Sequence, residues 1–174
     1  MQRAVFLDRD GVLNASVTRA HTPFGSPRTI DEFMLLPRVG EAVKLLKDLA
    51  LLVIVVTNQP EISRGDLSKS NLASMHKLLM RAMPIDDIFV CIHQDEENCE
   101  CRKPKIGMLL SAAQKWNIDL QNSFFVGDSW RDIEAGRCAG CTTILIGCSI
   151  CEDANPDYFG HDLSEAVVWI SECI

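Results

Sequence analysis

Two aspartates one residue apart, Asp8 and Asp10, close the apolar run VFL near the start of the chain. Side chains alternate along an extended backbone, so both carboxylates project to the same side. Negative charges held this close are costly unless a cation or a proton offsets them. Gly11 follows at once and allows a sharp turn beside a bound group. The pair therefore indicates a metal or catalytic site, and the alternative is a strand end with two solvated acids.

Polar side chains also follow the later apolar runs of the sequence. They are Thr57, Asn58 and Gln59 after LLVIVV, Arg102 and Lys103 after DIFVC and a Cys-rich insertion, and Asp128 after SFFV. If these runs are parallel strands, their carboxyl ends meet at one edge, where open α/β sheets bind ligands. Acids, a hydroxyl and two cations at one edge predict a site for phosphate and metal.

Each of these groups has a role in phosphoryl transfer. Asp8 can attack phosphorus and form an aspartyl-phosphate, which divides one hard step into two easier ones. Asp10 can protonate the leaving alkoxide and then activate water. Asp8 and Asp128 suit Mg²⁺, which prefers a few carboxylates together with water and substrate phosphate. Thr57 and Lys103 can donate a hydroxyl proton and a compact positive charge to the phosphate oxygens.

Other side chains at this edge are expected to bind the substrate or to position the catalytic groups. Asn58 and Gln59 face the substrate in this interpretation, and the planar fork of Arg102 can hold a second phosphate or a sugar hydroxyl. Asp132 can orient Lys103 or a metal-bound water. An acid favoured near a helix N-terminus explains Asp132 equally well.

The insertion before Arg102 contains four potential zinc ligands within residues 91–101: Cys91, His93, Cys99 and Cys101. Three thiolates and an imidazole complete a tetrahedral Zn²⁺ site and leave no open position. We therefore predict a structural zinc that pins this acidic loop and preorganises the cations after it. The alternative is a chance cluster of thiols.

Four further cysteines and three further histidines are not assigned to a metal site. The cysteines Cys138, Cys141, Cys148 and Cys151 have the spacing C-x2-C-x6-C-x2-C. An extended segment over 142–147 would separate the two pairs by about 20 Å, so core or loop thiols are favoured over a second zinc site. The histidines His21, His76 and His161 are isolated in the sequence and are assigned to the surface or to helix faces.

The elements that position these residues alternate between strands and helices. Strands are predicted at residues 4–7, 51–56, 87–91, 123–126 and 142–146, and helices at 38–50, 68–82, 106–116, 130–139 and 163–172. Such alternation predicts right-handed crossovers and a mainly parallel sheet covered on both faces. We expect one α/β domain over residues 1–174, because neither a repeat nor a linker is evident.

Composition narrows the classes of function. The net charge of −7 disfavours a nucleic-acid backbone as partner. No apolar stretch has the length of a membrane span, and the N-terminal MQRAVFLDRD lacks the long apolar stretch of a signal peptide. Eight cysteines in such a chain favour metal ligands and buried thiols over disulfides. We expect a cytoplasmic monomer that acts on a small molecule.

The motifs DRDGVLN, TNQ, RKP and GDSWRD, in this order, resemble the four signature motifs of the haloacid dehalogenase-like (HAD) phosphohydrolases. The resemblance extends from residue 5 to about residue 146. It implies a Rossmann-like three-layer domain, Mg²⁺, Asp8 as nucleophile and Asp10 as acid and base. It also implies that Asp10 offers its backbone carbonyl to the metal.

Within this family, a zinc loop just before RKP resembles the branch of the D-glycero-D-manno-heptose 1,7-bisphosphate and histidinol-phosphate phosphatases. TNQPEISRG is similar to the TNQ…ARG segment of that branch, which places Arg64 beside the substrate, although Pro60 and Glu61 replace the commoner Ser-Gly. No inserted cap domain is expected, because residues 15–37 are too few and 58–86 contain one helix.

The resemblance therefore implies Mg²⁺-dependent hydrolysis of a sugar phosphate, foremost the 7-phosphate of the heptose bisphosphate. The alternatives are a phosphatase for histidinol phosphate or another small phosphomonoester, and a zinc-stapled binding protein without catalysis.

Overall fold

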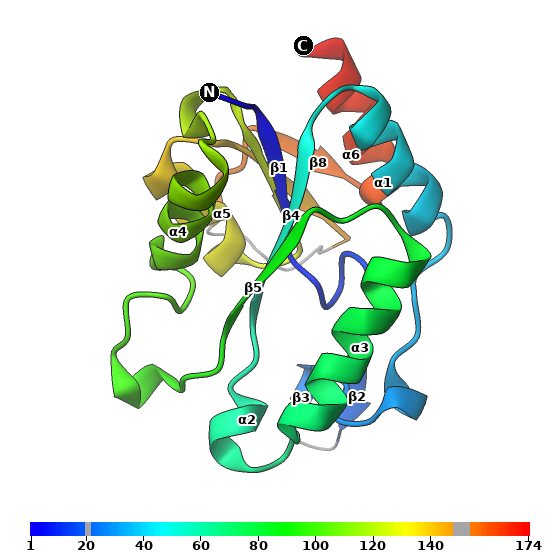
Figure 1. The fold of residues 1–174 in the computed structure, drawn as a ribbon, viewed down its shortest axis with the longest axis vertical. Helices are drawn as coiled ribbons and strands as arrows, with labels where there is room; N and C mark the ends of the chain where they lie inside the picture. The colour runs from blue at the N-terminus through cyan, green and yellow to red at the C-terminus, as the bar shows by residue number, and fades with distance from the viewer. Residues whose placement is uncertain (20–21, 148–153) are drawn as a thin grey trace.

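A computed structural model describes residues 1–19, 22–147 and 154–174 of the chain. His21, Cys148 and Cys151 lie outside the described residues. Within them, a parallel sheet has the strand order β5-β4-β1-β6-β7-β8 (Figure 1). Its strands are β1 (Ala4–Leu7), β4 (Leu52–Asn58), β5 (Asp87–Cys91), β6 (Phe124–Gly127), β7 (Thr142–Ile146) and β8 (Tyr158–Gly160).

Helices cover both faces of this sheet. On one face lie α1 (Val39–Asp48) and α6 (Leu163–Glu172), and on the other lie α4 (Gly107–Trp116) and α5 (Trp130–Ala139) (Figure 1). The longer α3 (Lys69–Ala82) stands below α1, toward the carboxyl ends of the strands. The short helices are α2 (Glu61–Arg64), η1 (Ile30–Glu32), η2 (Asp95–Glu97) and η3 (Leu120–Asn122). None of the described helices combines the length and the apolar character needed to cross a bilayer.

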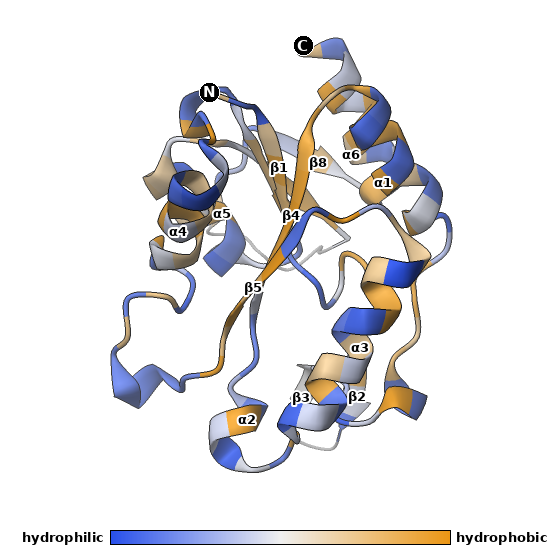
Figure 2. Cartoon of the chain, in the orientation of Figure 1, coloured by the Kyte–Doolittle hydropathy of each residue, from blue (hydrophilic) through white to orange (hydrophobic). Residues whose placement is uncertain are grey.

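The alternation of side chains along the strands divides the core into two layers. Val5 and Leu7 of β1 are fully buried against the face that carries α1 and α6. Ala4 and Phe6 are fully buried on the opposite face, against α4 and α5. Because both faces are covered, the central strands are apolar throughout, which is typical of parallel sheets. Figure 2 shows this as a hydrophobic sheet inside helices with hydrophilic outer faces.

The sheet register brings the predicted catalytic strand ends together. Phe6 of β1 pairs with Ile54 of β4 on one side and with Phe125 of β6 on the other. The strands run parallel, so their carboxyl ends open on the same edge of the sheet. The predicted α/β class and mainly parallel sheet are confirmed.

Several elements differ from the prediction. Strand β4 continues through Thr57 and Asn58, and the sheet includes β8, which was not predicted. The antiparallel hairpin of β2 (Val17–Arg19) and β3 (Thr22–Gly25) was also not predicted. The sequences of these three strands, VTR, TPFG and YFG, contain no apolar run like those that predicted β1 and β6. Between β1 and α1 the described residues hold only this hairpin and η1, so no cap domain is evident there.

A buried hydroxyl ties the start of β1 to the loop before β6. Ser123 is fully buried, its Oγ accepts from the Ala4 N–H at 3.0 Å, and it donates to the Asp119 carbonyl at 2.5 Å. Ser123→Ala leaves the Ala4 N–H without this acceptor, which should lower the free energy of unfolding by about 1–3 kcal/mol. Urea unfolding measures the loss. Ser171→Ala, which removes an exposed hydroxyl, is the control, and equal losses in both variants would contradict the role of Ser123.

Candidate active site

A buried lysine joins two acids at the carboxyl edge of the sheet. Lys103 Nζ lies 2.8 Å from Asp8 Oδ1 and 2.6 Å from Asp132 Oδ1. It also donates to the Val56 carbonyl at 2.9 Å, at the end of β4. Only 2% of Lys103 is exposed, so its ammonium group is removed from water and depends on these partners. The ammonium group of Lys103 thus links the ends of β1 and β4 to the first turn of α5.

The charges in this cluster are not balanced by the protein alone. Burial raises the pKa of Asp8 to about 7, with Lys103 opposing the rise and Asp132 adding to it. Burial and the charges of Asp8 and Asp132 raise the pKa of Asp128 to about 8. Burial lowers the pKa of Lys103, but the charges of Asp132 and Asp8 raise it well above its usual range. A further cation would therefore stabilise the ionised carboxylates.

A candidate metal site lies in the same cluster. Asp8, Asp128 and Asp132 each offer a carboxylate oxygen, and these atoms lie within 4.8 Å of one another. Hard oxygen donors at this spacing suit Mg²⁺. Asp132 also completes a capping box with Ser129 at the start of α5, so both sequence interpretations of Asp132 hold. The carboxylate of Asp10 is not in this group, which leaves its backbone carbonyl as the donor expected from the resemblance.

Close approach of Asp128 to the first strand requires glycine at position 11. Gly11 has a φ of +84°, and a Cβ added there would lie 1.8 Å from Asp128 Oδ2. A side chain at this position would thus meet both backbone strain and the carboxylate itself. Gly127 is similarly restricted, because an added Cβ would lie 2.1 Å from the Cβ of Asp132. The glycines leave room for the acids.

Asp10 turns toward a set of hydrogen-bond donors. Arg9 Nη2 donates to its Oδ1 at 2.8 Å and its Oδ2 at 3.0 Å, and Arg9 Nε donates to Oδ1 at 3.0 Å. Asn14 Nδ2 and Gln59 Nε2 each donate at 2.8 Å. Burial raises the pKa of Asp10, but the charge of Arg9 and these hydrogen bonds outweigh it and lower the pKa below its usual value. The carboxylate is therefore held in one orientation.

The residues after β4 contact the catalytic groups from within the protein. Asn58 donates to the Lys103 carbonyl and accepts from the Lys103 N–H, both at 3.1 Å. Gln59 is fully buried and donates to Thr57 Oγ1 at 2.9 Å in addition to Asp10. The sequence interpretation placed Asn58 and Gln59 against the substrate, whereas the structure gives both side chains partners in the protein. Thr57 is 1% exposed at the end of the strand.

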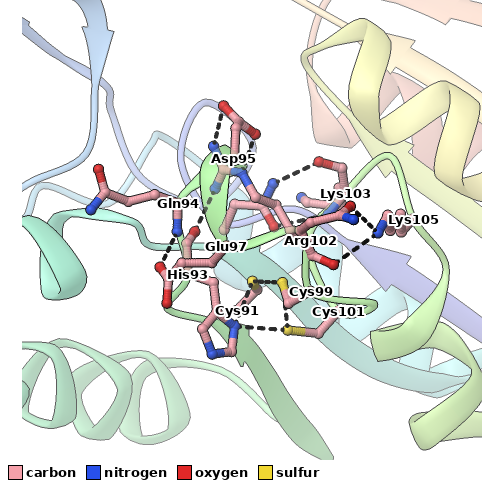
Figure 3. A network of polar contacts seen from close by, with 12 residues as sticks. Cys91, His93, Gln94, Asp95, Glu97, Cys99, Cys101, Arg102, Lys103 and Lys105 are labelled. Atoms are coloured by element: carbon pink, nitrogen blue, oxygen red, sulfur yellow. Dashed lines mark hydrogen bonds and ion pairs between the residues drawn. The ribbon is translucent and has the colours of Figure 1, made fainter.

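The predicted zinc ligands lie together after β5 (Figure 3). The separations around the group are 3.5 Å for Cys91 to Cys99, 3.4 Å for Cys99 to Cys101, 3.3 Å for Cys101 to His93 Nδ1 and 3.7 Å for His93 Nδ1 to Cys91. The edges of a tetrahedron with Zn–S bonds of 2.3 Å are about 3.7 Å long. The thiols are too far apart for disulfides. The donor set therefore fits zinc.

The predicted substrate arginines lie around this loop. Arg102 Nε pairs with Asp95 Oδ1 at 2.5 Å, and Arg102 Nη1 donates to the His93 carbonyl at 3.2 Å. Arg64 Nε, at the end of α2, donates to the Gln94 side chain at 3.3 Å. Figure 3 shows Asp95 joined to Arg102 by dashed lines. Residues of the loop thus orient the Arg102 guanidinium. Nothing in the sequence indicated that Asp95 is one of them.

Cys138 and Cys141 form no metal group in the described part of the chain. Cys138 is exposed, and Cys141 is buried. Cys141 agrees with the assignment to core thiols, whereas Cys138 is an exposed residue of α5 and belongs to neither the core nor a loop.

A carboxylate at the end of the first strand, a buried lysine that contacts it and acids for a divalent cation define the class of HAD-like phosphohydrolases. A family profile described as HAD-hydrolase-like matches residues 100–166. The D-glycero-beta-D-manno-heptose-1,7-bisphosphate 7-phosphatase of Pasteurella multocida is 38% identical over 167 residues, which cover 88% of this chain and 87% of that protein. The D-glycero-alpha-D-manno-heptose-1,7-bisphosphate 7-phosphatase of Campylobacter jejuni is 33% identical over 149 residues, 83% and 81% of the two chains.

A solved structure agrees with these relatives. The D,D-heptose 1,7-bisphosphate phosphatase from B. bronchiseptica, complexed with magnesium and phosphate, superimposes with a TM-score of 0.86. It is 28% identical, and the match covers 99% of this chain and 100% of that one. The chain belongs to the family of HAD phosphatases that these heptose-bisphosphate phosphatases represent, and it is a phosphoric monoester hydrolase.

Gly11→Ala tests the link between the first strand and Asp128. The added Cβ displaces the Asp128 carboxylate, so the affinity for Mg²⁺ should fall about tenfold or more, as measured by isothermal titration calorimetry. Gly65→Ala is the matched control. Gly65 also has a positive φ, +79°, but an added Cβ would meet nothing within 4 Å. Equal losses of affinity in both variants would mean that backbone strain, and not displacement of Asp128, is the cause.

Proposed function

We propose that the enzyme hydrolyses the 7-phosphate of D-glycero-D-manno-heptose 1,7-bisphosphate with Mg²⁺, through an aspartyl-phosphate on Asp8. The observation that carries this proposal is the buried contact of Lys103 with Asp8 and Asp132 beside Asp128. The relatives described above support the choice of substrate. Histidinol phosphate and other small phosphomonoesters are the competing substrates.

In the first half-reaction, an Asp8 carboxylate oxygen forms a bond to phosphorus while the bond from phosphorus to the sugar oxygen breaks. Lys103 holds Asp8 in place and supplies positive charge to the phosphate. The Thr57 hydroxyl accepts from Gln59, so its own proton is directed to a phosphate oxygen. Bound Mg²⁺, held by Asp8, the Asp10 carbonyl and Asp128, would offset the repulsion between nucleophile and phosphate.

Asp10 carries the proton in both half-reactions. Its carboxyl gives a proton to the sugar oxygen as the ester bond breaks. In the second half-reaction it takes a proton from the water whose oxygen bonds to phosphorus, and Asp8 is released. The proton that leaves Asp10 in the first step is replaced in the second.

The loop over residues 91–101 supports the substrate side of the site in this proposal. A structural Zn²⁺ on Cys91, His93, Cys99 and Cys101 fixes the loop. The loop in turn aims Arg102 at the sugar or at the second phosphate. Arg64 borders the same side, at the end of α2. Asn58 and Gln59 act beneath the substrate, through their contacts with Lys103 and Asp10. The proposal includes a single domain over residues 1–174 that works as a cytoplasmic monomer.

Kinetics on alternative substrates test the proposed function. We expect kcat/KM for heptose 1,7-bisphosphate to exceed that for histidinol phosphate by about 100-fold or more, because the arginines can pair with a second phosphate. Asp8→Asn removes the nucleophile and should lower kcat more than about 1,000-fold for either substrate. Release of inorganic phosphate is the measurement.

Asp31→Asn, a change at an exposed acid on η1, is the matched control and should keep full activity. A preference for histidinol phosphate would reject the heptose substrate but keep the phosphatase. Full activity in Asp8→Asn would reject the aspartyl-phosphate.

Loss of zinc should weaken substrate binding without removing the chemistry. Cys99→Ser breaks the tetrahedral set, so the zinc content should fall from about one ion per chain to near zero. KM should rise severalfold, because the His93 carbonyl no longer holds Arg102 in position. Elemental analysis and steady-state kinetics measure the two effects. Cys138→Ser, at an exposed thiol, should change neither, and a Cys99→Ser variant that keeps its zinc would contradict the assignment.

A further inference from the structure

Arg9 lies between the two catalytic acids in the sequence, and its side chain turns toward the second of them. Its side chain is fully buried. A guanidinium cannot lose its charge in a protein, so each buried N–H needs an acceptor or a compensating contact. Arg9 therefore depends on acceptors inside the protein to stabilise its buried charge.

The acceptors around Arg9 come from different parts of the chain. Nε and Nη2 donate to Asp10, as described above. Nη1 lies 3.3 Å from Nε2 of His76, which α3 supplies. The ring of Phe33 lies 5.5 Å from the guanidinium carbon, a distance that suits a cation–π contact. His76 is thus the acceptor for the end of Arg9 that Asp10 does not hold.

The contact with His76 has a defined direction. Because Arg9 only donates, His76 Nε2 must accept, and the ring must be neutral. Burial and the charge of Arg9 lower the pKa of His76 to about 4, with Asp10 opposing, so the ring is neutral at physiological pH. The buried residues Leu72, Met75 and Leu79 anchor α3 in the core. The position of this ring is therefore set by the packing of a helix, and the sequence-based assignment of His76 as an isolated residue was incomplete.

We propose that Arg9 and His76 are a positioning pair that orients the Asp10 carboxyl for its two proton transfers. This inference rests on the function proposed above. His76 holds one end of the Arg9 guanidinium, and the other end holds both oxygens of Asp10. Asp10 also has side-chain hydrogen bonds with Ser26, Asn14 and Gln59. Without His76, the buried Nη1 loses this acceptor, the guanidinium shifts toward another one, and Asp10 moves with it. The proton transfer then starts from a misplaced carboxyl, while Asp8, Lys103 and the metal ligands stay in place.

The dependence on the leaving group separates this role from general stability. A sugar alkoxide needs a proton as it leaves, whereas p-nitrophenolate leaves without one. The parameter kcat/KM reports the steps up to the formation of the aspartyl-phosphate, in which the leaving group departs. In His76→Leu we expect kcat/KM for heptose 1,7-bisphosphate to fall about tenfold or more, with kcat/KM for p-nitrophenyl phosphate within about threefold of the unmodified enzyme. The loss for the sugar phosphate should lie in kcat, with KM little changed.

His76→Gln restores an acceptor for Arg9 and should recover most of the lost activity toward the sugar phosphate. His161→Leu, at an exposed histidine outside this network, is the matched control and should keep both values. Thermal unfolding checks that each variant is folded. His76→Asn, whose amide is too short to reach Arg9, takes the place of His76→Leu if the apolar side chain prevents folding.

Parallel losses for both substrates, no loss for either, or a His76→Gln variant as impaired as the Leu variant would each overturn the positioning role. Failure of the proposed function gives a different result, since the unmodified enzyme would then not hydrolyse the heptose bisphosphate. In that case histidinol phosphate or another alkyl phosphate that the enzyme hydrolyses serves as the poor leaving group in the same comparison.

Discussion

The buried ammonium of Lys103 is the interaction on which the site depends. A charge in this position is tolerated only because Asp8 and Asp132 lie within hydrogen-bond distance of it. Those acids come from β1 and α5, and Asn58 of β4 holds the backbone of Lys103 in place. The sheet order, with β1 between β4 and β6, is the arrangement that brings these segments to one point. The fold and the chemistry therefore share one constraint.

A second network serves the second acid and is separate from the first. Asp8 is surrounded by acids and one lysine, whereas Asp10 is surrounded by N–H donors. Two carboxylates one residue apart thus occupy opposite electrostatic environments, and the pKa of Asp8 rises while that of Asp10 falls. The ionised form that Asp10 favours is the one that takes a proton from water, and a divalent cation beside Asp8 would favour the ionised, nucleophilic form of that carboxylate. Gln59 extends this second network to the end of β4, because it contacts both Asp10 and Thr57.

Strong local patterns made most of the sheet and the grouping of catalytic residues predictable. Asp8, Thr57, Lys103 and Asp128 each follow a predicted strand, and parallel strands end at one edge, so their convergence followed from topology. The zinc ligands, among them Cys91 and Cys99, could be grouped because they are close together in the sequence. The contact of His76 with Arg9 could not be predicted, since it joins residues far apart through the packing of α3. Likewise, β8 is too short for its pattern to stand out.

The close approach of Gly11 to Asp128 has an evolutionary consequence. Because a Cβ at position 11 and a carboxylate at position 128 compete for the same space, a side chain at position 11 is disfavoured for as long as the acid at position 128 is kept. A substitution at position 11 becomes acceptable only after the acid at 128 has been lost, and with it the metal site. Sequences that keep the acid at position 128 should therefore also keep glycine at position 11. A side chain at position 11 would mark a descendant in which the acid at position 128 no longer serves the metal site.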